Sequence, residues 1–172
     1  MAIVICDSSF LILISKIEML DLLIEAFKEI IIPQAVYIES VKQGKLFKKM
    51  DAFLIEERIK KKKIIVGDIE NLSEKDRLIK DFGIHEGEAE AILIYLEKSA
   101  NLLGTDDYKT IKVCKILDIK YFTTPIFIMR SFLNKIISKE IALLKFEQLL
   151  EFGWYNEAII IDFKNNIKNS EE

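Results

Sequence analysis

Short runs of consecutive apolar residues alternate along the chain with longer stretches in which apolar positions recur every three or four residues. The short runs have the length of strands and lie at residues 2–6, 30–33, 64–66, 101–104 and 121–124. Because these runs are apolar on consecutive positions, both faces of the sheet that they form should be covered by helices. The pattern therefore predicts an α/β fold, a three-layer α/β/α sandwich around a central, mostly parallel sheet of about five strands.

Helices are predicted between these strands and after the last of them. The predicted helices occupy residues 9–17, 19–29, 34–43, 46–60, 73–81, 86–99 and 107–117, and a helical C-terminal extension runs from about 125 to 168. The extension has one internal break, at EFGWYNE, where Gly153 is expected to end a helix. No linker rich in Pro, Gly or Ser precedes it, so residues 1–172 are expected to form a single domain with the extension packed on it.

Composition and charge narrow the class of protein without naming a function. The chain has 172 residues, of which 51% are hydrophobic and 31% charged, and this suits a globular domain with a substantial core. A net charge of -3 neither predicts nor excludes binding to a nucleic acid, so any such surface must be local. Cys6 and Cys114 are isolated in apolar surroundings, as expected of reduced thiols in the cytoplasm. Neither an export signal nor a membrane span is expected.

Acidic residues follow the predicted strands. Asp7 and Asp106 each come directly after one, and in a parallel sheet ligands bind beyond the carboxyl ends of the strands. Glu39 and Glu88 could reach the same edge from neighbouring helices. Carboxylates that gather repel one another unless a cation neutralises them, and oxygen ligands suit Mg²⁺ or Mn²⁺. Such an ion activates water and stabilises charge on a phosphoryl group, so the acids indicate phosphodiester cleavage.

Helical geometry chooses among the acids of HEGEAEAILIYLE. On a wheel of about 100° per residue, Glu88 lies with Ile92 and Leu96 on the apolar face. Glu86 and Glu90 fall on the opposite arc, which we expect to face solvent. A charge on the buried side of a helix needs a partner, so we select Glu88 over Glu90 as the site residue.

Four segments together resemble the acidic motifs of the PIN domain family, in order and spacing. They are IVICDSSFLI, IIIPQAVYIESV, HEGEAEAILIYLE and LLGTDDYKTIKVCKILDI, and the resemblance runs from residue 2 to about 168. It is closest to VapC-like ribonucleases whose third motif reads Gly-Glu-Ala-Glu-Ala and whose C-terminus is a helical extension. The resemblance implies a nuclease that depends on Mg²⁺ or Mn²⁺ and cleaves RNA. It also implies a homodimer and, for many members, a toxin restrained by an antitoxin protein.

The resemblance assigns roles to individual residues. It implies that Asp7, Glu39, Glu88 and Asp106 are catalytic and that Asp7, Glu88 and Asp106 bind the metal ion. It implies supporting roles for Ser9, which steadies the first aspartate, and for Asp107. The third acid is Glu88 where many members have aspartate, so one or two bound ions remain possible.

Simpler interpretations remain open for several of these residues. Asp7 could merely cap the helix that follows it, and one of Asp106 and Asp107 is expected to be a helix cap. Glu39 could be an ordinary solvated residue, and His85 is expected in a loop near the cleft. A basic run could follow an RNA backbone or could simply end a solvated helix. It consists of Arg58, Lys60, Lys61, Lys62 and Lys63.

The function that the sequence favours is that of a Mg²⁺- or Mn²⁺-dependent endoribonuclease. The resemblance adds the role of the toxin in a toxin–antitoxin pair. The alternative is a PIN-like module with weak or no activity that acts through protein–protein interaction. A phosphoacceptor receiver or a haloacid-type phosphatase would share the topology. A receiver needs paired acids near the first strand and a late lysine, a haloacid-type phosphatase needs Asp-x-Asp, and CDSS supplies neither acidic pattern.

Overall fold

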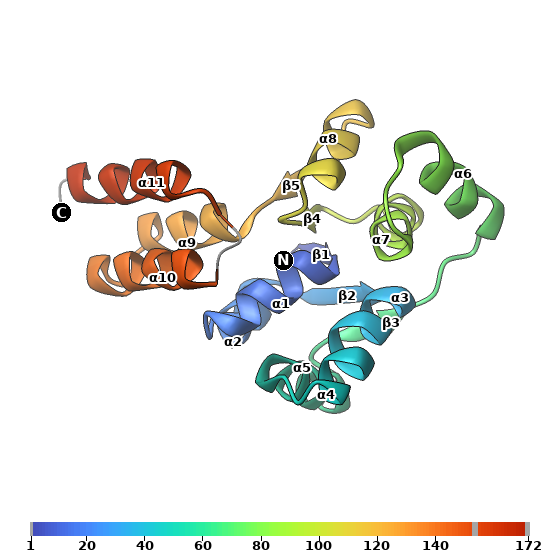
Figure 1. Cartoon of the computed structure of the whole chain (residues 1–172), viewed down its shortest axis with the longest axis horizontal. Coiled ribbons are helices and arrows are strands. Elements are labelled where there is room, and N and C mark those ends of the chain that lie inside the picture. Colours follow the sequence, from blue (N-terminus) through green and yellow to red (C-terminus); the bar gives the residue numbers. More distant parts are fainter. Residues whose placement is uncertain (1, 153–154, 171–172) are drawn as a thin grey trace. The chain divides into compact units, whose positions relative to one another are not determined.

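The computed structural model describes residues 2–152 and 155–170 (Figure 1). It divides into two compact units, residues 1–122 and residues 123–172, which are described separately. The first unit contains the sheet, and the second contains only helices in its described part. The packing of the extension on the sheet domain stays a prediction.

Five parallel strands form the sheet of the first unit, and their order is β3-β2-β1-β4-β5. Their bounds are Ile3–Cys6 for β1, Glu29–Pro33 for β2, Ile65–Gly67 for β3, Leu102–Gly104 for β4 and Tyr121–Phe122 for β5. The chain adds β2 and β3 on one side of β1, then returns to add β4 and β5 on the other. The order therefore reverses between β1 and β4, which is where open parallel sheets bind ligands.

Helices cover both faces of this sheet, as the apolar runs predict. The helical elements of the first unit are α1 (Ser8–Lys16), α2 (Leu20–Ala26), α3 (Gln34–Tyr37), the π-helix η1 (Ile38–Gln43), α4 (Gly44–Leu46), α5 (Met50–Lys60), α6 (Leu72–Phe82), α7 (Glu86–Glu97) and α8 (Tyr108–Ile116). Figure 1 shows α6, α7 and α8 on the other side of the sheet from α1, α2 and α5. The predicted α/β/α sandwich is confirmed.

Alternation along β1 divides its side chains between two cores. Ile5 packs with Ile31 and Leu103 against the helices α6, α7 and α8. The opposite face receives α1, whose Phe10 is fully buried and meets Phe122 edge-on at 4.8 Å between ring centroids. A Cβ atom at Gly104 would lie 2.7 Å from the Phe10 ring, so glycine allows α1 to approach β4 closely.

The helix boundaries differ from the prediction mainly around residues 44–50. The helix predicted over 34–43 continues through η1 and α4 as far as Leu46, and α5 then begins at Met50. Lys48 closes the earlier helix with a left-handed backbone (φ 53°), and the Lys49 N–H donates to the Gly44 carbonyl at 3.0 Å. No glycine or proline marks this turn, which explains why the sequence pattern misplaced it.

Three helices make up the described part of the second unit. They are α9 (Thr124–Leu133), α10 (Lys139–Glu151) and α11 (Glu157–Asn169). Phe146 is fully buried and stacks on Phe163 at 5.4 Å between ring centroids. A break separates α10 from α11 as predicted, and Gly153 lies outside the described residues. The prediction of a single break is wrong, because residues 134–138 also separate α9 from α10, at a turn where Lys135 has a left-handed backbone (φ 58°) and no glycine or proline marks the sequence. Within residues 2–152 and 155–170, the helices are too short or too polar to cross a membrane.

Candidate active site at the carboxyl edge of the sheet

Asp7 is the buried acid at the switch point of the sheet. Its N–H donates to the Gly104 carbonyl at 3.0 Å, which continues the β1–β4 pairing by one residue, and its side chain is 1% exposed. The carboxylate accepts hydrogen bonds from the Phe10 N–H at 2.9 Å and from Ser9 Oγ at 2.6 Å. A third comes from the Thr105 hydroxyl. Asp7 therefore caps α1, as the simpler interpretation holds, but it does so inside the protein.

Burial makes this carboxylate an unfavourable anion. The pKa of Asp7 is raised from 3.8 to about 7, mainly by desolvation and to a smaller extent by the negative charge of Asp106. The hydrogen bonds from Phe10, Ser9 and Thr105 act in the opposite direction and do not compensate. An ordinary cap is exposed and keeps a low pKa, so capping alone does not explain a buried acid beside a second one. A bound cation would stabilise both charges.

Two hydroxyl groups tie Asp7 to the loop after β4. Ser9 Oγ accepts the Asp106 N–H at 2.9 Å while it donates to Asp7. Thr105 Oγ1 likewise accepts the Asp107 N–H at 3.2 Å while it donates to the other carboxylate oxygen of Asp7. Sequence reasoning singled out Ser9 but missed Thr105, which is fully buried. The sequence signal that could have identified Thr105 is a polar residue directly after the apolar run that forms β4, the strand that pairs with β1.

The Asp106–Asp107 doublet divides its roles in the structure. Asp107 is the N-cap of α8, and its Oδ1 accepts the Thr110 N–H at 2.8 Å and the Thr110 hydroxyl at 3.1 Å. Asp106 is half-buried, and its charge acts on Asp7 and on Cys6, whose pKa is raised mainly by burial. One member of the doublet is thus a cap, as expected, and the other is the neighbour of Asp7.

Glu88 and Glu39 lie on α7 and η1. Glu88 is half-buried, and its carboxylate accepts the His85 N–H at 2.7 Å. Burial is the main cause that raises the pKa of Glu88, and the charges of Asp107 and Glu39 add to it. Glu39 is exposed and accepts a hydrogen bond from Ser8 Oγ at 2.8 Å, which links it to the first turn of α1. Glu39 and His85 also line a common surface pocket.

The expectation that Glu90 faces solvent is wrong. Glu90 is 8% exposed, and its Oε2 accepts the Ala35 N–H at 2.9 Å. Its other oxygen lies 3.5 Å from Lys75 Nζ. The helical wheel failed because α3 and α6 cover the side of α7 that the wheel left to solvent, so more than half of its circumference is buried. Glu90 holds α3 against α7, while Glu88 reaches back to the start of its own helix.

The predicted acids form neighbouring pairs and do not form a preassembled metal cage. Within residues 2–152 and 155–170, no three His, Cys, Asp or Glu side chains are grouped so as to hold a metal ion. Asp7 is coupled to Asp106, and Glu88 to Asp107 and Glu39. Mg²⁺ commonly binds through only one or two carboxylates and keeps several waters, so neighbouring acids that include Asp7 and Glu88, whose pKa values are raised, suit such an ion chemically.

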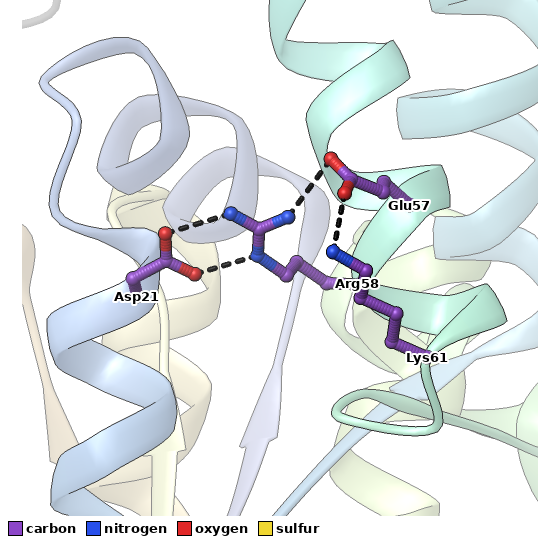
Figure 2. Close-up of polar contacts among 4 residues, drawn as sticks. All are labelled: Asp21, Glu57, Arg58 and Lys61. Carbon is purple, nitrogen blue, oxygen red and sulfur yellow. Dashed lines mark hydrogen bonds and ion pairs between the residues drawn. The ribbon is translucent and has the colours of Figure 1, made fainter.

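The basic run at residues 58–63 lies far from these acids. Because the run directly precedes β3, it lies at the amino edge of the parallel sheet. Asp7 and Asp106 follow their strands and therefore lie at the opposite, carboxyl edge. Figure 2 shows Arg58 held between Asp21, at 2.6 Å, and Glu57, at 2.9 Å. Lys60 and Lys61 pair with acids of the preceding turn. Arg58 therefore links α5 to α2, and Lys60 and Lys61 pair with acids of α5, while contact of the basic run with RNA stays a prediction.

Comparison with known proteins gives the family. No curated protein matches the chain. A family model described as PIN domain matches residues 3–163, so it covers the sheet unit and most of the extension. PIN domains are generally nucleases and generally bind divalent metal ions. The match extends over nearly the whole sequence and agrees with the five-stranded parallel sheet and its acidic carboxyl edge. The chain belongs to the PIN domain family.

Proposed function

We propose that this chain is a Mg²⁺- or Mn²⁺-dependent endoribonuclease. The observation that carries the proposal is Asp7, a buried carboxylate with a pKa of about 7 beside the second acid, Asp106, at the switch point of the sheet. Burying an acid here costs stability, and a structural role would be filled more cheaply by asparagine or serine. Family membership supports nuclease chemistry at this position.

Asp7 and Asp106 would hold the ion first, and Glu88, which is not grouped with them in the described residues, would join them when the ion binds. The ion would supply activation of water and stabilisation of charge on the phosphoryl group. Ser9 and Thr105 fix the orientation of the Asp7 carboxylate through hydrogen bonds to its two oxygens. Ser8 fixes Glu39 in the same way, and Glu39 can then assist by orienting water or substrate at the rim. These contacts hold Asp7 and Glu39 in place before the substrate arrives, which lowers the cost of assembling the rest of the site.

Cleavage of single-stranded RNA in the presence of Mn²⁺ tests the proposal. We expect Asp7→Asn and Asp106→Asn each to lower the rate by at least about 100-fold, because each removes a charged ligand in a desolvated site. Asp76→Asn is the matched control, since Asp76 is an exposed acid on α6, and it should cleave at the wild-type rate. Cleavage that survives unchanged in Asp7→Asn would come from a contaminant and would remove the support for an enzyme.

The arrangement of the acids also favours a second candidate function. Since the described residues offer pairs of carboxylates but no grouped set of three, the chain could be a PIN-like module of weak or no activity that acts by binding protein. Failure of the pure wild-type chain to cleave RNA with either ion, although it binds the ion, would support this candidate.

The finer parts of the proposal concern the setting of the nuclease. We propose a cytoplasmic toxin, active on RNA as a homodimer and restrained by an antitoxin protein. Its support is the resemblance of the four acidic segments to VapC-like ribonucleases, together with two buried cysteines that are both free thiols. A small companion reading frame beside the gene would be the first sign of the antitoxin.

A further inference from the structure

The turn between α4 and α5 carries an apolar surface that the site does not use. Leu46, Met50 and Phe47 are 81%, 79% and 74% exposed, the highest values among the large hydrophobic side chains that the structure describes. Phe53, one turn further along α5, is 43% exposed. We call these four side chains the hairpin patch.

The backbone under the hairpin patch is well ordered by contacts. A Cβ atom at Gly44 would lie 2.7 Å from the Cβ atom of Ala52, so glycine lets α4 lie directly against α5. The Lys48 and Lys49 N–H groups bond back to α4 at 3.0 Å each, and Lys45 pairs with Glu56 at 2.7 Å. The exposed apolar side chains therefore project from a turn whose backbone is held by hydrogen bonds and packing. A group of exposed apolar side chains typically marks an interaction site.

Positive charges predominate around the hairpin patch, although Asp51 follows Met50 and Glu56 pairs with Lys45. Lysines occupy positions 42, 45, 48 and 49, and no Asp or Glu lies between Glu39 and Asp51. Lys45 Nζ lies 5.6 Å from the centroid of the Phe53 ring, at the border of the apolar surface. A second copy of the chain would bring lysines against lysines, which is unfavourable, whereas carboxylates on a partner would be attracted.

The side chains of the hairpin patch also distinguish protein from RNA. Unstructured RNA binds through base stacking on aromatic rings, which Phe47 and Phe53 could provide, but the two most exposed side chains of the patch, Leu46 and Met50, have no ring. Burying aliphatic side chains from water needs an apolar complement, which a helix provides with residues at i, i+3, i+4 and i+7. Methionine and leucine at an exposed helical turn are typical of surfaces that receive such a helix.

We propose that the hairpin patch docks a protein segment with an apolar helical face bordered by carboxylates. The inference is independent of nuclease activity, because it uses none of the acidic residues of the candidate site. The partner's apolar side chains cover Leu46, Phe47 and Met50, and its acids pair with Lys48 and Lys49. A few residues at the centre of an interface carry most of its binding energy, and Phe47 offers the most exposed ring of the patch.

Two designed helical peptides test the chemistry of the partner. They share leucines at i, i+3, i+4 and i+7 and differ only in flanking residues, glutamate in one and lysine in the other. Fluorescence anisotropy with the full chain should show the glutamate peptide binding at least about tenfold more tightly than the lysine peptide. The double variant Lys48→Glu/Lys49→Glu should reverse this preference, which a merely destabilised chain would not do.

Apolar variants and further probes complete the test. Phe47→Ser should weaken binding of the glutamate peptide by at least about tenfold, whereas Ile116→Ser, at a 67%-exposed position on α8, should leave it unchanged. The proposal is overturned if neither peptide binds, or if the preference does not reverse. It is equally overturned if the wild-type chain is a dimer and the Phe47→Ser chain is a monomer. The same holds if Phe47→Ser abolishes binding of a short single-stranded RNA in EDTA while binding of the glutamate peptide persists.

Discussion

The variant Asp7→Asn is expected to make the folded chain more stable than the wild type at alkaline pH. The reason is the buried Asp7 carboxylate, whose pKa rises from 3.8 to about 7 on folding. The folded chain holds this proton more tightly than the unfolded chain does, so folding takes up a proton between these two pH values. The contribution of Asp7 to stability is therefore complete below pH 3.8 and is lost as the pH rises through about 7.

The size of the effect follows from the width of that window. At about 1.4 kcal/mol per pH unit, the difference in unfolding free energy between Asp7→Asn and the wild type should grow by on the order of 4 kcal/mol from pH 4 to pH 8. Asparagine keeps the shape of the side chain and an oxygen for the Phe10 N–H. Urea unfolding of both chains at a series of pH values, without divalent ions, measures this difference.

Asp76→Asn controls for the general effect of removing a negative charge. Asp76 is exposed, so the unfolding free energy of the Asp76→Asn chain should differ from that of the wild type by a small amount that is constant from about pH 4 to pH 8. A pH-independent difference for Asp7→Asn would show that Asp7 is not held in the desolvated position described above.

Phe10→Ala is expected to destabilise the chain by about 3–5 kcal/mol, because it empties a fully enclosed position. Phe10 is 0% exposed, lies over Gly104, and contacts Phe122 edge-on. Its backbone N–H is also one of the donors to Asp7, so collapse of this corner should loosen α1 at the site. Thermal and urea unfolding at one pH measure the loss.

Phe47→Ala provides the comparison for Phe10→Ala. It removes the same ring from a side chain that is 74% exposed, so the free energy of unfolding should change by no more than about 0.5 kcal/mol. Equal losses for the two variants would contradict the described packing of α1 on the sheet.

The sheet could be predicted from sequence because burial on both faces leaves a direct trace. Ile5 and Ile31, which face α7, and the residues that alternate with them, which face α1, are all apolar, so the runs stand out. The turn at Lys48 left no such trace, because the backbone adopts a left-handed conformation without glycine and the apolar residues around it are exposed. Periodicity reports burial, and it fails where apolar residues are not buried.

The sequence predicted which acids follow the strands of the sheet, but it predicted few of the contacts that these acids make. Parallel topology alone places Asp7 and Asp106 at one edge, since each follows a strand. The helical wheel considers one helix at a time, so it could not show that α3 and α6 would bury Glu90. Thr105 was missed because its role depends on pairing with a strand about a hundred residues away. The charge pattern of the basic run likewise could not show that Arg58 would pair with Asp21 and Glu57 (Figure 2).

Titration calorimetry with Mn²⁺ at a pH just below 7 tests the central claim most directly. If the acids at the carboxyl edge hold the ion, binding must displace the proton that Asp7 holds there, because its pKa is about 7. The account predicts binding to the wild type with release of protons, seen as a heat that depends on the buffer, and loss of both in Asp7→Asn but not in Asp76→Asn. Binding and proton release that are the same in Asp7→Asn, or no binding to the wild type, would contradict it.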